Sequence, residues 1–242
     1  MATGTPRLDK VMPFSIIMPI DTNRLEQFKN TKLVYDTYPQ KKEFIMPTRS
    51  FKEVSEYLDK YKLWKDVKLV PYKLKVFTNP SMAFNIGVRN SKYDQIIITS
   101  PEVIPLTDVL PQLEEFIGSN VVCQVYDAKE DSTLGMSLVN KIFRADDPGM
   151  YFLAMFNKSD IEKINGWDED FMKGYAYDDN DFGARWKRAG LPFEINEEIK
   201  ALHQWHPRFE TIPGGYNKSF QHFCWNTDNN IIYCKNGLKV LK

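Results

Sequence analysis

Short apolar runs alternate with helix-like stretches through the first half of the chain, and this alternation limits the fold more than any other feature. The run Phe14–Ile20 is largely apolar on both faces, which is typical of a strand buried inside a parallel sheet. The residue pattern predicts further strands over 43–46, 94–99 and 120–126, and helices over 23–35, 50–63, 79–90 and 106–117. Strands and helices in this alternation predict a parallel α/β sheet flanked by helices.

The helix predicted over 50–63 has a start signal of its own. Ser50 is expected to cap its first turn, and Glu53, three residues later, completes a capping box. Pro47 is expected to end the strand before it. In an open α/β sheet, ligands bind beyond the carboxyl ends of the strands. The candidate binding loops are therefore the segments that follow strands: Asp21–Arg24, Pro47–Ser50 and Ser100–Glu102.

The composition argues against nucleic-acid and membrane-spanning classes. Basic and acidic residues number 32 each, so the 242-residue chain lacks the positive field that drives binding to nucleic acid. No apolar run approaches the ~20 residues needed to span a bilayer, and residues 1–12 contain no apolar signal region. The three cysteines have no metal-binding spacing and are interpreted as reduced thiols. These features predict a cytoplasmic protein, or one whose membrane anchor lies outside this chain.

A basic stretch over 60–75 interleaves lysines with the aromatic residues Tyr61, Trp64 and Tyr72. Its simplest interpretation is a solvated face whose aromatic side chains turn inward. The alternative is contact with a membrane surface or an anionic acceptor, which would make the protein membrane-peripheral.

The stretch from Tyr151 to His206 carries the motifs with the most chemical content. An apolar run over 151–156 leads into a helix start and then a tight Asn165-Gly166-Trp167 turn. An acidic cluster opens a second predicted helix, and the pair His203-x-x-His206 follows it. The cluster consists of Asp178, Asp179 and Asp181.

Helical spacing separates the three acidic residues. At ~100° per residue, Asp179 shares a stripe with Phe182 and Trp186, whereas Asp178 and Asp181 are expected to turn away. A carboxylate on an inward stripe is costly unless it faces a polar cleft. The alternative is structural, because acidic residues at a helix N-terminus gain ~0.3–1 kcal/mol each from the macrodipole. Asp178 would then be only the N-cap.

In order and spacing, these motifs resemble GT-A fold glycosyltransferases of the family-2 type, and the C-terminal half resembles the galactosyltransferase-like variant. The resemblance covers 14–206. It implies a single Rossmann-like GT-A domain with a mostly parallel central sheet, which transfers a sugar from a nucleotide donor to an acceptor hydroxyl. The implied division is an N-terminal leader over 1–13, a nucleotide-sugar-binding half over 14–128, an acceptor-binding and catalytic half over 129–206, and a C-terminal tail over 207–242 that could act as a lid.

The resemblance also implies which residues bind the donor and a metal. Family members carry an Ala-Arg-Asn-x-Gly helix, matched here by Ala83–Gly87, and an Asp-x-Asp motif that binds Mn²⁺ or Mg²⁺, matched here by Ser100-Pro101-Glu102. A late histidine completes the metal site in many members. His203 and His206 are expected to point to opposite faces of an extended segment, so that one of them binds the metal. His206 is favoured because family patterns place it at the mouth of the cleft. The implied metal ligands are thus Glu102 and His206. The implied donor-binding residues are Pro19, Asp21, Arg24, Arg49, Asn85, Ser100 and Glu102.

In the same family an acidic pair at a helix start supplies the base of inverting enzymes. The resemblance places Asp178 and Asp179 in that pair, with Asp179 as the general base. Trp167, Asp168 and Tyr177 are the implied acceptor-binding residues, although Trp167 could instead pin a helix to the sheet. A uridine donor is favoured, whereas Arg49 could instead read a guanine or a phosphate. The acceptor would be a glycan, a lipid-linked sugar or a protein.

Three other readings stay open at this point. A retaining GT-A transferase shares the late acidic and histidine motifs. A nucleotide- or glycan-binding module without turnover is motivated by Ser100, which replaces the first aspartate of Asp-x-Asp. A nucleotidyltransferase would require a glycine-rich, basic loop after the first strand, and Asp21–Arg24 is not one.

Overall fold

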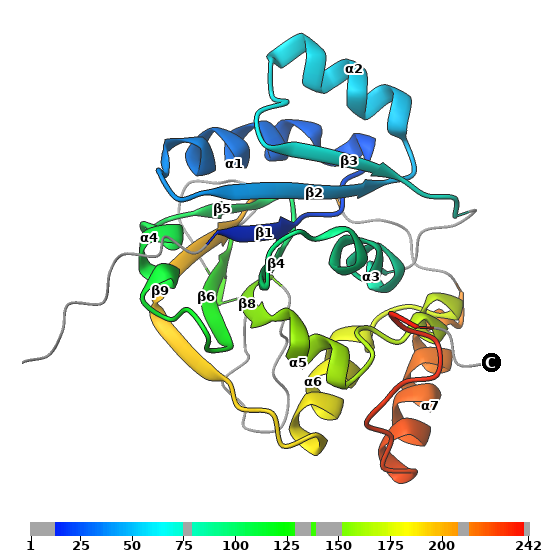
Figure 1. Ribbon diagram of the computed structural model, residues 1–242. Helices are drawn as coiled ribbons and strands as arrows, with labels where there is room; N and C mark the ends of the chain where they lie inside the picture. Colours follow the sequence, from blue (N-terminus) through cyan, green and yellow to red (C-terminus); the bar gives the residue numbers. More distant parts are fainter. Residues whose placement is uncertain (1–12, 75–78, 129–136, 139–151, 208–212, 240–242) are drawn as a thin grey trace, which may run out of the picture.

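The protein folds around one nine-stranded sheet with helices on both faces (Figure 1). The computed structural model describes residues 13–74, 79–128, 137–138, 152–207 and 213–239. The strands are β1 (Phe14–Ile17), β2 (Lys42–Thr48), β3 (Val67–Pro71), β4 (Gln95–Thr99), β5 (Val103–Pro105), β6 (Val121–Asp127), β7 (Ser137–Leu138), β8 (Leu153–Asn157) and β9 (Glu194–His203). The helices are α1 (Leu25–Thr37), α2 (Phe51–Tyr61), α3 (Ser81–Asn90), α4 (Val109–Glu114), α5 (Lys158–Lys163), α6 (Asp178–Arg188) and α7 (Gly215–Asp228), with 3-10 turns η1 (Thr22–Arg24) and η2 (Glu169–Lys173). The predicted α/β class is confirmed.

The sheet order is β3-β2-β1-β4-β8-β6-β9-β5, and β7 pairs with β6. Neighbours from β3 to β4 are parallel, while β8 is antiparallel to both β4 and β6, and β9 is parallel to β6. It follows that β1, β2, β3, β4, β6 and β9 all run in the same direction. Their carboxyl ends therefore meet at one edge of the sheet, where ligands bind in open α/β folds.

The sheet buries a separate hydrophobic cluster on each face. Successive residues of a strand point to opposite faces, so Ile16 of β1 belongs to one cluster and Ile17 to the other. Figure 1 shows α1 and α2 on one side of β1–β3, with α3, α5 and α6 on the other. On that second face, a Cβ atom at Gly87 of α3 would overlap the side chain of Ile17, so only glycine allows the helix to approach β1 this closely.

Three local predictions need correction. β2 continues through Pro47 to Thr48, because the backbone carbonyl of Pro47 still accepts a hydrogen bond from Ile20 N. Ser50 does not cap α2 with its side chain, since its hydroxyl donates to Asp21 Oδ1 at 2.6 Å instead. The basic stretch over 60–75 contains the edge strand β3, which the lysine-rich pattern concealed. Lys75 and residues 76–78 lie outside the described residues.

The described part of the C-terminal tail packs against the turn that precedes η2. The side-chain amide of Asn165 donates to the carbonyl of Cys234 at 2.8 Å, and the backbone N–H of Leu238 donates to the carbonyl of Asn165 at 2.8 Å. α7 itself packs on η2 and on α6. The lid role of the tail stays a prediction, as does the four-part division of the chain. Residues 1–12 of the predicted leader and most of 129–151, Tyr151 included, lie outside the described residues.

None of the helices in the described ranges combines the length and the apolar character needed to cross a bilayer.

Candidate active site

Backbone pairing brings two distant segments together at the carboxyl edge of the sheet. Glu102 lies between β4 and β5, and the next residue, Val103, pairs with His203 at the end of β9. Gln204 fixes this arrangement, because its backbone N–H donates to the carbonyl of Glu102 at 2.8 Å. Its side-chain amide also donates to Thr31 Oγ1 of α1, at 3.1 Å. The register of β5 against β9 therefore places the late histidines beside the Ser-Pro-Glu turn.

Three side chains then converge on the carboxylate of Glu102. The Nε2 atoms of His203 and His206 each lie 3.6 Å from Glu102 Oε1, and Arg24 Nε lies 3.6 Å from the same oxygen. The other ring nitrogen of His203, Nδ1, lies 3.0 Å from Asp127 Oδ1 at the end of β6. We call Glu102, His203 and His206 the Glu-His-His cluster.

The neighbouring positive groups affect the pKa of Glu102 more than its burial does. Burial alone would raise the pKa of this carboxyl, but His203, His206 and Arg24 hold the pKa well below its ordinary value of 4.5. For His203, burial alone would lower the pKa, but Glu102 and Asp127 raise it above the ordinary 6.5. Glu102 is thus ionised at neutral pH. Its second oxygen, Oε2, is buried and has no hydrogen-bond partner among the described residues.

The prediction that only one of the two histidines reaches the site was wrong in its geometry. Both imidazoles adjoin Glu102, and β9 ends at His203, so His206 lies outside the strand. Alternation of side chains therefore does not apply between His203 and His206. The ligand-type atoms of Glu102, His203 and His206 all lie within 4.8 Å of one another, close enough to share one metal ion. Asp127 and Gln204 were not predicted from the sequence, although Asp127 directly follows the strand predicted over 120–126, a position where site residues are often found.

A second polar cluster lies at the ends of β1 and β2. Asp21 forms a salt bridge with Arg49 and accepts a hydrogen bond from Ser50. Burial alone would raise the pKa of Asp21, but Ser50 and Arg49 lower it. Tyr72, which follows β3, has its pKa raised to about 12, chiefly by burial. Arg24, which contacts Glu102, belongs to the same loop as Asp21. The two clusters are therefore neighbours along the carboxyl edge of the sheet.

The remaining predicted donor residues fall into two groups. Pro19 and Ser100 are half-buried in the loops after β1 and β4, at the predicted edge. Asn85 has a different role from the predicted one, because it is fully buried and its amide ties α3 to the turn over 165–170, which we call the acidic turn. Its Nδ2 donates to the carbonyl of Trp167 at 2.8 Å, and its Oδ1 accepts from the backbone N–H of Trp167 at 3.0 Å. These internal bonds occupy the groups that a donor would need.

The acidic residues of α6 are oriented differently from the predicted stripe. Asp178 and Asp181 are buried, whereas Asp179 is only half-buried. The prediction failed because α7 covers a second side of α6, where Asn226 donates to Asp181 Oδ1 at 2.7 Å. The N-cap alternative also fails for Asp178, since Tyr177 is the N-cap residue and Asp178 already belongs to the helix.

Burial separates the two candidate catalytic carboxylates chemically. Burial, helped by the neighbouring carboxylates of Asp179 and Asp181, raises the pKa of Asp178 well above its ordinary value of 3.8. Asp178 Oδ2 is also buried without a hydrogen-bond partner among the described residues. A raised pKa favours the protonated form, which cannot accept a proton, so of this pair Asp179 is the better suited to act as a base.

The turn before α6 stores backbone strain. Ala176 and Tyr177 adopt left-handed conformations, with φ of 63° and 65°, which are unfavourable for residues with a Cβ atom. Aromatic packing holds Tyr177 in place: its ring contacts Phe220 and Phe223 of α7, and its hydroxyl lies 2.6 Å from that of Tyr216. Strain maintained by the surrounding structure is common where a site must be pre-organised.

The predicted acceptor residues lie around this turn, but they are not equally accessible. Trp167 is fully buried and stacks on Phe182, with ring centroids 4.1 Å apart, so it pins α6 and cannot stack on a sugar in this structure. Tyr177 is half-buried under α7. Asp168 is nearly buried and accepts hydrogen bonds from His222 Nε2 at 2.9 Å and from Asn226 at 3.3 Å.

The Asp168–His222 pair predicts a pH dependence of stability. Asp168 raises the pKa of His222 above 6.5, more than burial lowers it. The pair therefore stabilises the fold fully below about pH 6.5, and this contribution is lost as the pH rises through the raised pKa. Removing a hydrogen bond between charged groups costs about 1.5–3 kcal/mol, so His222→Gln should destabilise by that amount near pH 6 and by less near pH 9. Urea unfolding of both proteins across this range measures the difference, and a cost that stays constant with pH would contradict the pairing.

One family model matches the chain over residues 150–207, and it is described as the N-terminal domain of galactosyltransferase. This is the segment that contains the acidic turn, α6 and the Glu-His-His histidines. It agrees with the galactosyltransferase-like resemblance predicted for the C-terminal half. A sequence search of curated proteins found no match.

Solved structures match over most of the chain. Staphylococcus aureus TarS in complex with UDP superposes with a TM-score of 0.67 at 10% identity, over 90% of this chain and 66% of that one. The fold is that of GT-A-type glycosyltransferases. A mannosyltransferase from Pyrobaculum calidifontis, in complex with GDP-Man and Mn²⁺, superposes with a TM-score of 0.58 at 14% identity, over 78% of this chain and 56% of that one. The chain thus spans no more than about two thirds of the length of these structures.

Proposed function

We propose that this protein is a glycosyltransferase that moves a sugar from a nucleoside diphosphate donor to an acceptor hydroxyl. The observation that carries the proposal is the Glu-His-His cluster with Arg24, at the carboxyl edge of the parallel strands in a GT-A fold. That edge is where ligands bind in open α/β sheets. The structural relatives support a nucleotide-sugar donor, since TarS was solved with UDP and with UDP-GlcNAc.

The cluster fits a divalent cation. Glu102 is ionised, and its Oε2 lacks a hydrogen-bond partner among the described residues, as expected for an oxygen that is available to coordinate a cation. Asp127 engages Nδ1 of His203 and leaves Nε2 directed at Glu102, the usual arrangement around a metal-binding imidazole. Two imidazoles with one carboxylate favour a transition metal such as Mn²⁺ over Mg²⁺, which prefers oxygen ligands. Bound there, the cation would offset the charge that develops on the leaving diphosphate.

The residues of the chain then have separate tasks in transfer. We place the base and ribose of the nucleotide against a wall formed by the Asp21–Arg49 pair and the neighbouring Tyr72. Arg24, held by Glu102, adds a fixed positive charge on the diphosphate side. Asp179 takes the proton from the acceptor hydroxyl as it attacks the anomeric carbon from the face opposite the diphosphate. This displacement inverts the anomeric centre, and the configuration of the product, read by NMR, separates it from retention.

Release of nucleoside diphosphate from a donor panel tests the proposal, with water standing in for the unknown acceptor. UDP-glucose, UDP-galactose, UDP-GlcNAc and GDP-mannose would each be incubated with the protein and Mn²⁺. We expect slow release from one of the uridine donors, and its loss when the metal is chelated.

A binding module without turnover is the second candidate. It is favoured by one observation, the Ser100-Pro101-Glu102 sequence in place of two aspartates. Tight binding of a nucleotide sugar with no release from any donor would support this candidate and contradict the transferase.

A further inference from the structure

A cavity of about 360 Å³ lies between α7, the acidic turn and the C-terminal segment. It shares no residue with the Glu-His-His cluster. Its lining includes Asp168, Asp170, His222, Trp225, Asn226 and Tyr233. A volume of this size lies within the range of small-ligand sites in proteins, roughly 300–1,000 Å³.

The wall of the cavity combines flat aromatic surface with hydrogen-bonding groups. Trp225 and Tyr233 are 55% and 38% exposed, although large aromatic side chains are usually buried. The indole of Trp225 lies parallel to the imidazole of His222, with an interplanar angle of 5°. Aromatic faces that stay accessible beside carboxylates and an imidazole suit a ligand with C–H faces and hydroxyl groups, which describes a sugar ring.

A metal ion is a poorer occupant, although Asp168, Asp170 and His222 lie close together. The carboxylate of Asp168 already accepts from His222 and Asn226, and that of Asp170 accepts from Lys173 and Asn236. A cation would have to displace these partners. A hydroxyl need not, because a carboxylate has about four acceptor sites and can take a further hydrogen bond.

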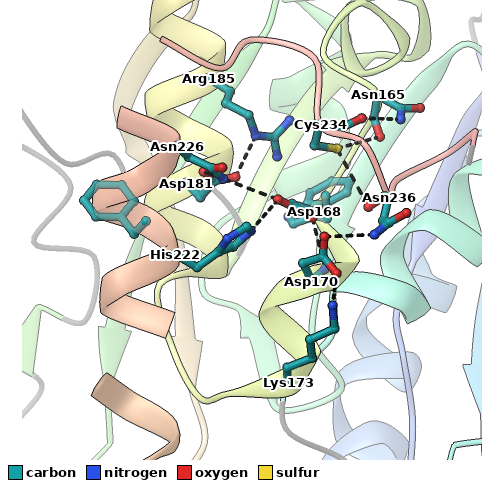
Figure 2. A network of polar contacts seen from close by, with 12 residues as sticks. Asn165, Asp168, Asp170, Lys173, Asp181, Arg185, His222, Asn226, Cys234 and Asn236 are labelled. Atoms are coloured by element: carbon teal, nitrogen blue, oxygen red, sulfur yellow. Dashed lines mark hydrogen bonds and ion pairs between the residues drawn. The ribbon is translucent and has the colours of Figure 1, made fainter. Parts of the chain in front are cut away.

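The floor of the cavity is rigid and is connected to the catalytic helix. Figure 2 shows Asn226 between two buried carboxylates: its Nδ2 donates to Asp181 at 2.7 Å and to Asp168 at 3.3 Å. Asp181 in turn accepts from Arg185 Nε at 2.6 Å. These bonds fix the cavity relative to the first turn of α6, which carries Asp179. A pre-formed pocket loses less entropy on binding than one that must be ordered.

We propose that this cavity binds a sugar unit of the acceptor, on the basis that the protein is the glycosyltransferase proposed above. Trp225 stacks on the ring, and Asp170 and His222 bind its hydroxyls. The Asn226 bridge holds this subsite at a fixed position relative to α6. The acceptor is therefore a saccharide or a glycoconjugate, and not a bare protein or lipid hydroxyl.

The test uses ¹⁹F NMR of the full chain labelled with 5-fluorotryptophan. Each of the five tryptophans gives one signal, assigned by single substitutions to phenylalanine. Glucose, galactose, mannose and N-acetylglucosamine are titrated separately to high millimolar concentration. We expect at least one sugar to shift the Trp225 signal and to leave that of the exposed Trp64 unchanged. Asp170→Asn should weaken this binding at least tenfold, whereas Asp228→Asn, at an exposed site at the end of α7, should not.

Two outcomes would overturn the subsite: no sugar shifts Trp225, or Asp170→Asn binds as tightly as Asp228→Asn. Calorimetric titrations of UDP and of GDP, each with Mn²⁺, on the same samples keep the two proposals apart. UDP binding without any sugar effect removes the subsite and leaves the donor site in place. A sugar effect at Trp225 without binding of any nucleotide removes the transferase and leaves a saccharide-binding cavity.

Discussion

Asp179→Asn is expected to lower donor turnover by about 10²–10⁴-fold, the usual contribution of a general base. Asparagine keeps the size of the side chain but cannot take a proton. Asp179 is the less buried member of the pair at the start of α6, and the strained Ala176–Tyr177 turn fixes its position. Because Asp179 does not belong to the Glu-His-His cluster, the affinity for UDP should stay within about twofold of wild type. Release of nucleoside diphosphate measures the first effect and calorimetry the second.

Asp178→Asn is the matched control for this prediction. Burial and the neighbouring carboxylates raise the pKa of Asp178 and so favour its protonated form, which asparagine resembles in shape. We expect this variant to keep most of its activity. If Asp178→Asn were inactive and Asp179→Asn active, the two roles would be exchanged and the argument from burial would fail.

Arg185→Met is expected to destabilise the fold by about 3–5 kcal/mol, the cost of leaving a buried charge without its partner. Arg185 and Asp181 are both fully buried and form a salt bridge. The guanidinium also donates to the carbonyls of Ile164 and Gly166, at 2.7 and 2.9 Å. The substitution therefore removes the charge that pairs with the buried Asp181 carboxylate and the guanidinium donors to both carbonyls. Urea unfolding at pH 7 measures the loss.

Lys187→Met provides the comparison, because Lys187 lies on the same helix and is exposed. Its effect should stay within about 0.5 kcal/mol, as for most surface substitutions. A loss below 1 kcal/mol for Arg185→Met would mean that the Asp181–Arg185 pair does not hold α6 to the acidic turn.

The sequence predicted the parts of this fold that depend on local pattern. The run Phe14–Ile20 and the isoleucines of β4 are apolar on both faces because those strands lie inside the sheet with helices on both sides. The Ser100–Glu102 loop was predicted as a binding segment from its position after a strand, and the structure places Glu102 between β4 and β5 at the expected edge. By contrast, β3 is a half-exposed edge strand inside the lysine-rich stretch over 60–75, so its pattern resembled that of a surface loop.

The errors at the site have a common cause, which is packing between segments far apart in the chain. The prediction for Asp179 assumed that α6 has only one buried face. In the structure α7 covers a second face of α6. Asn85 matched a family motif, yet its partners lie in the turn that contains Trp167. His203 and His206 were predicted to point to opposite faces, which holds only within an extended strand. β9 ends at His203, so the prediction does not apply to His206. None of these contacts has a signature in local sequence.

Calorimetric titration of UDP and GDP, each with and without Mn²⁺, tests the central claim most directly when wild type is compared with Glu102→Ala. The account predicts that UDP binds to wild type only when Mn²⁺ is present, and that Glu102→Ala abolishes this binding because the variant lacks the carboxylate of the Glu-His-His cluster. UDP binding that is equal with and without the metal would contradict the metal role of the cluster. If neither nucleotide bound under any condition, the assignment as a nucleotide-sugar transferase would be wrong.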